Sequence, residues 1–126
     1  MSQYVDGPSK AFTAGAAIAQ YLRVKLTAGK LAVAGLTDKE IGTLEAASFA
    51  DLDTRTVRLR TAAGTTKMVA SEAISAGSAV HTAAGGKVSD TAATTSFLIG
   101  TALSSASGDN SVIEVLRNVH GDTANL

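Results

Sequence analysis

The chain has 126 residues, and its 11 basic and 11 acidic side chains give a formal net charge of zero. This length is typical of a single folded domain, and the neutral composition argues against nucleic-acid binding, which usually comes with a basic surplus. The absence of cysteine excludes disulfides, zinc–thiolate sites and a cysteine nucleophile.

Residues 1–12 are polar, contain the single proline and show no periodicity, which predicts an extended N-terminal arm. The alternative is a disordered terminus. The start of the chain has neither a basic head nor an apolar run, so we expect synthesis in the cytoplasm without a secretory signal. No apolar run is long enough for a membrane span, and we expect no membrane partner.

Period-two patterns dominate the chain from residue 20 onwards. Leu22, Val24 and Leu26 alternate with polar residues over 20–27, as in a half-buried strand. A Gly-Lys turn at 28–30 and a short return strand at 31–33 follow. Residues 37–40 fit a helix capping box, but Gly42 and Thr43 would interrupt a helix, so a turn into a strand at 41–47 is predicted. The further strands predicted are 54–61, 67–71, 77–82, 97–105 and 111–118, and residues 119–126 are predicted to form a C-terminal tail.

The sequence also repeats itself, which predicts a duplicated strand-turn-strand unit. Ile41-Gly42-Thr43 recurs as Ile99-Gly100-Thr101, 58 positions later, and residues 13–18 resemble 75–80. Toward the closing strand the offset is predicted to fall to 56, so that Val57 matches Ile113. We therefore expect an all-β fold, a small β-sandwich or barrel forming one domain at 13–118, with copies at about 13–61 and 75–117.

Residues that carry out catalysis or bind metals are sparse. His81 and His120 stand alone in the sequence, and the aspartates near 51–53 and 109 fit turns as well as they fit calcium ligands. Gly85-Gly86-Lys87 lacks the remaining residues of a phosphate-binding loop. We therefore expect no enzyme activity, no cofactor and no bound metal.

The polar faces of the strands differ between the two copies. In the first copy Arg23, Lys25, Arg58 and Arg60 are predicted to point outward, either as a basic stripe or simply as a solvated face. In the second copy Val112, Glu114 and Leu116 are predicted to point outward. In the predicted alignment of the copies, Glu114 is equivalent to Arg58 and Leu116 is equivalent to Arg60. Apolar side chains on an outward face indicate a surface that something covers. The core is also light, with 4% aromatic residues and no Trp, which favours completion by self-association.

Most of the chain, roughly residues 10–118, resembles a known family. The matching features are the Ala-Gly strand entries, the Gly-Lys turn and above all the segment IGTALSSASGDNSVIEVLR, which begins at Ile99. These features are similar to the small capsid decoration (cement) proteins of tailed bacteriophages, in particular the family long catalogued as a phage domain of unknown function. The charged turn at 38–40 and the long strand at 20–27 depart from that pattern.

The resemblance implies a structural protein on the outer capsid surface of a virion, with the major capsid protein as partner. It also implies a homo-oligomer, usually a trimer, that bridges capsid subunits and stiffens the head. The arm would add backbone hydrogen bonds to a neighbouring strand, so deleting 1–12 is expected to weaken capsid attachment more than folding. The candidate capsid or subunit contacts are Tyr4, Val5, Pro8, Phe12, Arg23, Lys25, Arg58, Arg60, Val112 and Leu116.

Two other functions remain open. One is a virion surface adhesin or head-fibre module that binds a host glycan; such a module needs exposed aromatic residues, and most of the five available (Tyr4, Phe12, Tyr21, Phe49 and Phe97) are expected in the core or arm. The other is a small hydrolase, whose activity would depend on His81 or Asp53.

Overall fold

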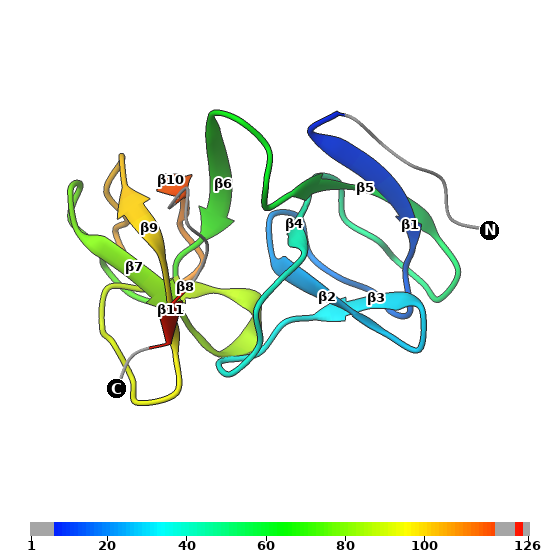
Figure 1. Cartoon of the computed structure of the whole chain (residues 1–126), viewed down its shortest axis with the longest axis horizontal. Helices are drawn as coiled ribbons and strands as arrows, with labels where there is room; N and C mark the ends of the chain where they lie inside the picture. Colours follow the sequence, from blue (N-terminus) through cyan, green and yellow to red (C-terminus); the bar gives the residue numbers. More distant parts are fainter. Residues whose placement is uncertain (1–6, 118–122, 125–126) are drawn as a thin grey trace.

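The computed structural model describes residues 7–117 and 123–124, and these form two antiparallel sheets that pack against each other (Figure 1). The expected all-β fold is confirmed. The first sheet contains β1 (Ser9–Thr13), β2 (Arg23–Thr27), β3 (Lys30–Val33), β4 (Gly42–Leu44) and β5 (Thr54–Leu59). The second contains β6 (Thr65–Val69), β7 (Ala79–Thr82), β8 (Val88–Ser89), β9 (Phe97–Ala102), β10 (Val112–Arg117) and β11 (Thr123–Ala124), with a 3₁₀ turn, η1 (Ala84–Gly86).

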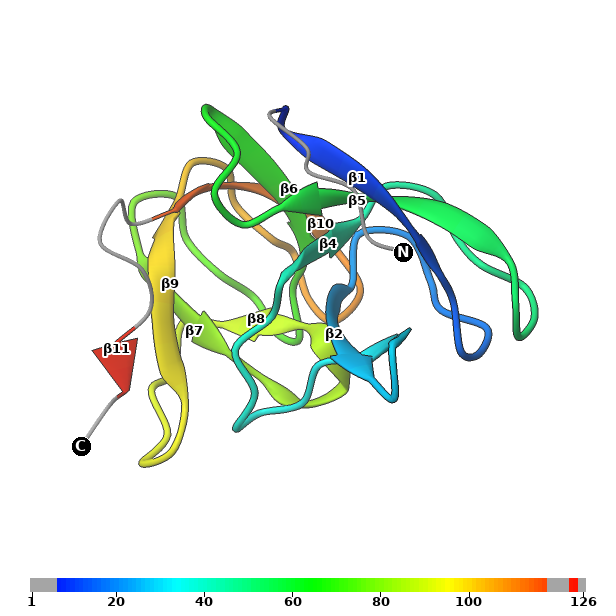
Figure 2. The same ribbon diagram turned by 45° about the vertical axis from the view of Figure 1, so that its right-hand side comes forward.

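The two sheets have the same topology. The first runs β1-β5-β4-β2-β3 and the second β6-β10-β9-β7-β8, so each strand of the first sheet has its counterpart five strands later. We call β1–β5 the first repeat and β6–β10 the second repeat. The edges of each sheet meet through a parallel bridge, Ala14 with Leu31 and Ala70 with Val88. Each sheet therefore curls into a nearly closed unit, and the two units lie side by side (Figures 1 and 2).

Each repeat has its own apolar core, and the two cores use equivalent positions. The first core contains Ile18, Val24, Leu31, Leu44 and Val57. The positions equivalent to these in the second core are Ile74, Val80, Val88, Ala102 and Val115. These aliphatic side chains come from alternating strand positions, which is how a pleated strand buries one of its faces.

The strand pairing corrects the predicted alignment of the copies. Gly42 pairs with Leu59 and Gly100 with Arg117, so β5 and β10 remain 58 positions apart and the predicted shift to 56 is wrong. The loops before β5 and β10 are equally long. Leu52 and Asn110 occupy the same left-handed position in the two loops, with φ of 76° and 72°. Leu116 is therefore the counterpart of Arg58, and Thr56 is the counterpart of Glu114.

The match between 13–18 and 75–80 is also wrong. Ile18 bridges to Ser48 as Ile74 bridges to Ala106, so the segment equivalent to 13–18 is 69–74. The similarity of small residues had favoured the later segment. The predicted arm overlaps a strand as well, since Ser9–Thr13 pair with β5 and Phe12 packs against the first core.

Candidate interaction surfaces

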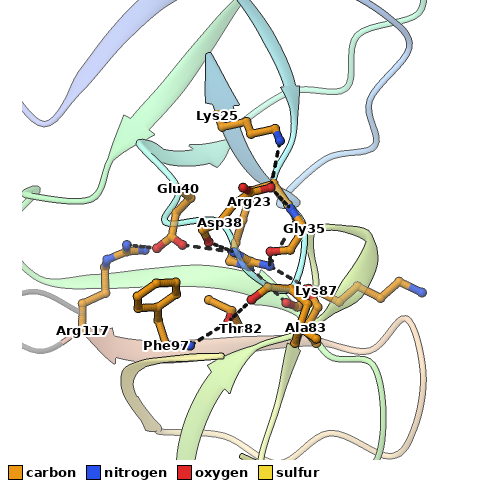
Figure 3. Close-up of polar contacts among 12 residues, drawn as sticks. Arg23, Lys25, Gly35, Asp38, Glu40, Thr82, Ala83, Lys87, Phe97 and Arg117 are labelled. Atoms are coloured by element: carbon orange, nitrogen blue, oxygen red, sulfur yellow. Dashed lines mark hydrogen bonds and ion pairs between the residues drawn. The ribbon is translucent and has the colours of Figure 1, made fainter. Parts of the chain in front are cut away.

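Arg23 holds the two repeats together and is not part of an outward basic face. Its side chain is fully buried and donates hydrogen bonds to backbone carbonyls of both repeats (Figure 3). In the second repeat, Nη2 donates to Ala83 at 2.7 Å and Nε to Lys87 at 3.0 Å. The period-two pattern of β2 correctly placed Arg23 opposite the core, but the second repeat covers that face. The predicted solvent exposure of Arg23 is therefore wrong.

Glu40 supplies the negative charge of this interface. Its fully buried carboxylate accepts a hydrogen bond from Arg23 at 3.2 Å and another from Arg117 of the second repeat. Thr82 adds a further bond between the repeats by donating to the carbonyl of Leu36 at 2.7 Å. We call Arg23, Glu40 and Arg117 the inter-repeat ion cluster. Buried charges persist in proteins when they are paired in this way, so the cluster sets the relative position of the repeats.

The other predicted basic residues do not form a stripe. Lys25 pairs with Asp38 at 2.8 Å, and that bond, together with the amide of Gly35, lowers the pKa of Asp38. Arg60 follows β5 and is half-buried. Arg58 points away from the core as expected, but into a groove between the repeats. Asp38 and Glu40 of the charged segment 38–40 thus bind basic side chains instead of starting a helix.

The groove between the repeats has a volume of about 730 Å³. The first repeat contributes Tyr21 and Arg58, and the second contributes Lys67 and Glu114. Lys67 Nζ lies 5.5 Å from the centre of the Tyr21 ring. Arg58 donates to the carbonyl of Ala63 at 2.6 Å, while its Nε is buried and has no hydrogen-bond partner within the described part of the chain.

Tyr21 adopts a backbone conformation that is unusual for a bulky side chain. Its φ is 68°, and the equivalent residue of the second repeat is Gly77, with φ of 92°. A left-handed conformation costs a residue with a Cβ atom roughly 1–2 kcal/mol, whereas glycine adopts it freely. In the first repeat, a strained backbone position therefore carries the aromatic ring that lies at the groove.

Val112 and Leu116 lie on the outward face of β10, as predicted. They are 50% and 49% exposed, and Leu103, beside Glu114 across from β10, is 44% exposed. We call Leu103, Val112 and Leu116 the β10 strip. The equivalents of Val112 and Leu116 in the first repeat are the polar Thr54 and Arg58. The apolar strip is therefore specific to the second repeat.

A second apolar surface was missed by the sequence-based prediction. Phe49 and Leu52, in the loop before β5, are 77% and 65% exposed, so Phe49 lies in neither the core nor the arm. We call this loop the apolar tip. Asp53 holds it in shape by accepting hydrogen bonds from the amides of Phe49 and Ala50, which lower the pKa of its carboxyl group. The equivalents of Phe49 and Leu52 in the second repeat are Ser107 and Asn110, a difference that a correct alignment of the copies would have shown.

The candidate contacts near the N-terminus are only partly described. Tyr4 and Val5 lie outside the described residues. Pro8 accepts a hydrogen bond from the amide of Leu59, and Phe12 packs against the first core beneath Lys10. Phe12 is partly buried and therefore contributes to folding, and its role in contacting a partner stays a prediction.

His81, Glu72 and Asp90 lie close to strands β7 and β8. Burial lowers the pKa of His81, which Asp90 partly counteracts. Glu72 accepts hydrogen bonds from Ser89 and Thr91, which lower its pKa, while the neighbouring Glu72 carboxyl raises the pKa of Asp90. Within residues 7–117 and 123–124, no group of three or more His, Asp or Glu side chains is placed to hold a metal ion.

Comparison with known proteins leaves the family open. The described part of the chain contains no helix with the length and hydropathy needed to cross a membrane. No protein-family model matches the sequence, and no curated protein is significantly similar to it.

Proposed function

We propose that the protein is a structural capsid decoration protein. It binds the outer surface of a phage head, with the major capsid protein as partner, and strengthens contacts between neighbouring capsid subunits. The observation that carries the proposal is a two-repeat body with apolar side chains exposed on both repeats, in the apolar tip and the β10 strip. Exposed apolar surfaces of this kind are typical of proteins that work in assemblies.

The construction of the body suits a bridging role. Each sheet is nearly closed, so few backbone groups are left at free edges, and the inter-repeat ion cluster holds the repeats in one arrangement. A protein that connects two capsid subunits must keep its contact surfaces at a fixed spacing. The segment with the strongest resemblance to decoration proteins forms β9 and β10, and thus includes the β10 strip.

In this proposal the protein acts as a homo-oligomer, a trimer being the form implied by the resemblance, on the virion surface after synthesis in the host cytoplasm. Several weak contacts per oligomer, and many oligomers per head, make attachment tight by multivalency. The formal net charge of zero is consistent with a partner that is recognised by shape and apolar contact.

Cosedimentation with expanded heads tests the proposal. The purified protein is expected to pellet with the heads and to saturate at a fixed number of copies per head, with its position then mapped by cryo-electron microscopy. Protein that stays in the supernatant at every concentration would refute the proposal.

A deletion that tests the role of the N-terminal residues in head binding must be shorter than residues 1–12. Removing residues 1–12 would delete most of β1 and so destroy the first sheet, because Ser9–Thr13 pair with β5. Removing residues 1–6 is expected to weaken head binding about tenfold or more without changing the unfolding midpoint. A variant lacking 125–126 is the matched control, and equal affinity of the two variants would exclude a binding role for 1–6.

The groove supports a second candidate, a head-fibre module that binds a host glycan. The observation in its favour is the strained Tyr21, an aromatic ring at the wall of a groove that also carries charged side chains. Saturation-transfer NMR with host surface glycans is expected to show contacts to the Tyr21 ring in this case, and Tyr21→Gly should abolish them. Absence of binding at millimolar glycan would exclude this function.

A further inference from the structure

We propose that copies of this chain associate head to tail, with the apolar tip of one copy seated on the β10 strip of the next. This inference rests on the proposed function in one respect, the homo-oligomer, and it names the two surfaces that form it. The tip belongs to the first repeat and the strip to the second. Each chain therefore carries one of each, so that one contact can be repeated around a closed ring.

The two surfaces do not cover each other within one chain. Phe49 is 77% and Leu52 65% exposed, and Val112 and Leu116 are about half exposed. Figures 1 and 2 both show the loop between β4 and β5 at the end of the first repeat that is remote from the second repeat, and β10 lies within the second repeat. A second copy is the occupant that matches both surfaces with one contact.

The two repeats differ at the positions that form these surfaces. The second repeat has Ser107 and Asn110 in place of Phe49 and Leu52, and the first repeat has Thr54 and Arg58 in place of Val112 and Leu116. The same fold therefore carries a polar residue at the equivalent of each of these four positions, and each repeat presents a different one of the two apolar surfaces.

The apolar tip contains a strained backbone position. Leu52 has φ of 76°, a conformation in which its counterpart Asn110 is well tolerated and a leucine is not. Strain of this kind is typically found at functional sites. The tip is also held rigid, because the Asp53 carboxylate binds two of its amides at 2.8 and 3.1 Å and Lys30 pairs with Asp51 at 3.1 Å. An apolar loop that is already ordered loses little entropy on binding.

Charged side chains of both signs lie beside each surface. Arg55 lies 5.9 Å from the centre of the Phe49 ring and pairs with Asp53 at 3.6 Å, which places a basic and an acidic side chain beside the tip. Glu114 lies between Val112 and Leu116 along β10 and opposite Lys67 of β6, which places an exposed carboxylate and an ammonium group at the strip. Opposite charges beside two apolar surfaces favour one register and orientation of the contact.

Two variants made from the protein's own alternative residues test this contact. F49S/L52N gives the first repeat the loop residues of the second, and V112T/L116R gives β10 the residues of β5. Each is expected to weaken self-association in sedimentation velocity about 30-fold or more, while circular dichroism remains that of the wild type. L26T is the control, since Leu26 is 45% exposed but belongs to neither surface.

Mixing the two variants distinguishes a head-to-tail contact from a symmetric one. Each variant keeps one intact surface, so an equimolar mixture is expected to form a heterodimer and nothing larger, although each variant alone is monomeric. A mixture that remains monomeric, or a wild-type chain that is monomeric at all concentrations, would overturn the inference. Because no capsid is present, this failure is distinct from failure of the proposed function, which is judged by head binding.

Discussion

Glu40→Gln tests how the two repeats are held together. The substitution keeps the size of the side chain but leaves the guanidinium groups of Arg23 and Arg117 buried without a counter-ion, and it points an amide donor at one of them. Removing one partner of a buried ion pair typically costs about 3–5 kcal/mol. For 126 residues, a loss of 1 kcal/mol lowers the unfolding midpoint by about 4 °C, so a decrease of roughly 10–20 °C is expected.

Urea unfolding followed by circular dichroism measures this change directly. The control is Asp109→Asn, which breaks the pair between Lys87 and the mostly exposed Asp109 and is expected to cost at most about 1 kcal/mol. An apolar replacement of the whole cluster, R23M/E40L/R117M, removes the unpaired charges but is expected to remain destabilised, because it also removes the hydrogen bonds of Arg23 to the carbonyls of Ala83 and Lys87. If Glu40→Gln unfolds within 1 kcal/mol of the wild type, the ion cluster does not hold the repeats together.

Three further substitutions probe the backbone and the pH dependence. Gly100→Ala is expected to cost more than 3 kcal/mol in urea unfolding or to prevent folding, because a Cβ atom there would overlap the carbonyl oxygen of Leu116; near-normal stability would refute the tight strand contact. Leu52→Asn is expected to stabilise the monomer by about 0.5–1 kcal/mol by relieving a left-handed leucine, and a loss of stability would contradict the strain. Burial lowers the pKa of His81, so the unfolded state binds more protons below the ordinary histidine value, and stability should fall as the pH drops from about 7 toward 5. His81→Gln is expected to flatten that part of the stability profile, and an unchanged slope would exclude His81 as its cause.

The overall architecture was predictable because its signals are local. Alternating apolar residues mark β2, β5 and β10, and the recurrence of Ile-Gly-Thr marks the duplication that the strand order confirms. The glycines of that motif recur because β4 and β9 approach their neighbours too closely for a side chain. The alignment within the copies was less predictable, since small residues such as Ala, Gly and Ser match equally well at several offsets.

The candidate surfaces were predicted only in part. The outward direction of Val112 and Leu116 follows from strand periodicity, which holds wherever one face of a sheet is buried. The exposure of Phe49 does not follow, because loop residues have no periodicity, and an aromatic side chain in a loop is as compatible with a core as with a surface. The comparison with Ser107 becomes informative only after the strand pairing has set the correct offset.

The amino-acid sequence was sufficient for the class of fold, the duplication and the face of each strand on which a side chain lies, because these depend on neighbours within a few residues or on the repeat itself. Whether a given outward face meets water, the other repeat or a groove depended on how the two sheets pack. Arg23 shows the difference: its place opposite the core is readable from β2, but its burial against the carbonyls of Ala83 and Lys87 comes from residues about 60 and 64 positions away. Because one repeat packs on the other, the charge of Arg23, which was expected in solvent, lies at the centre of the interface between the repeats.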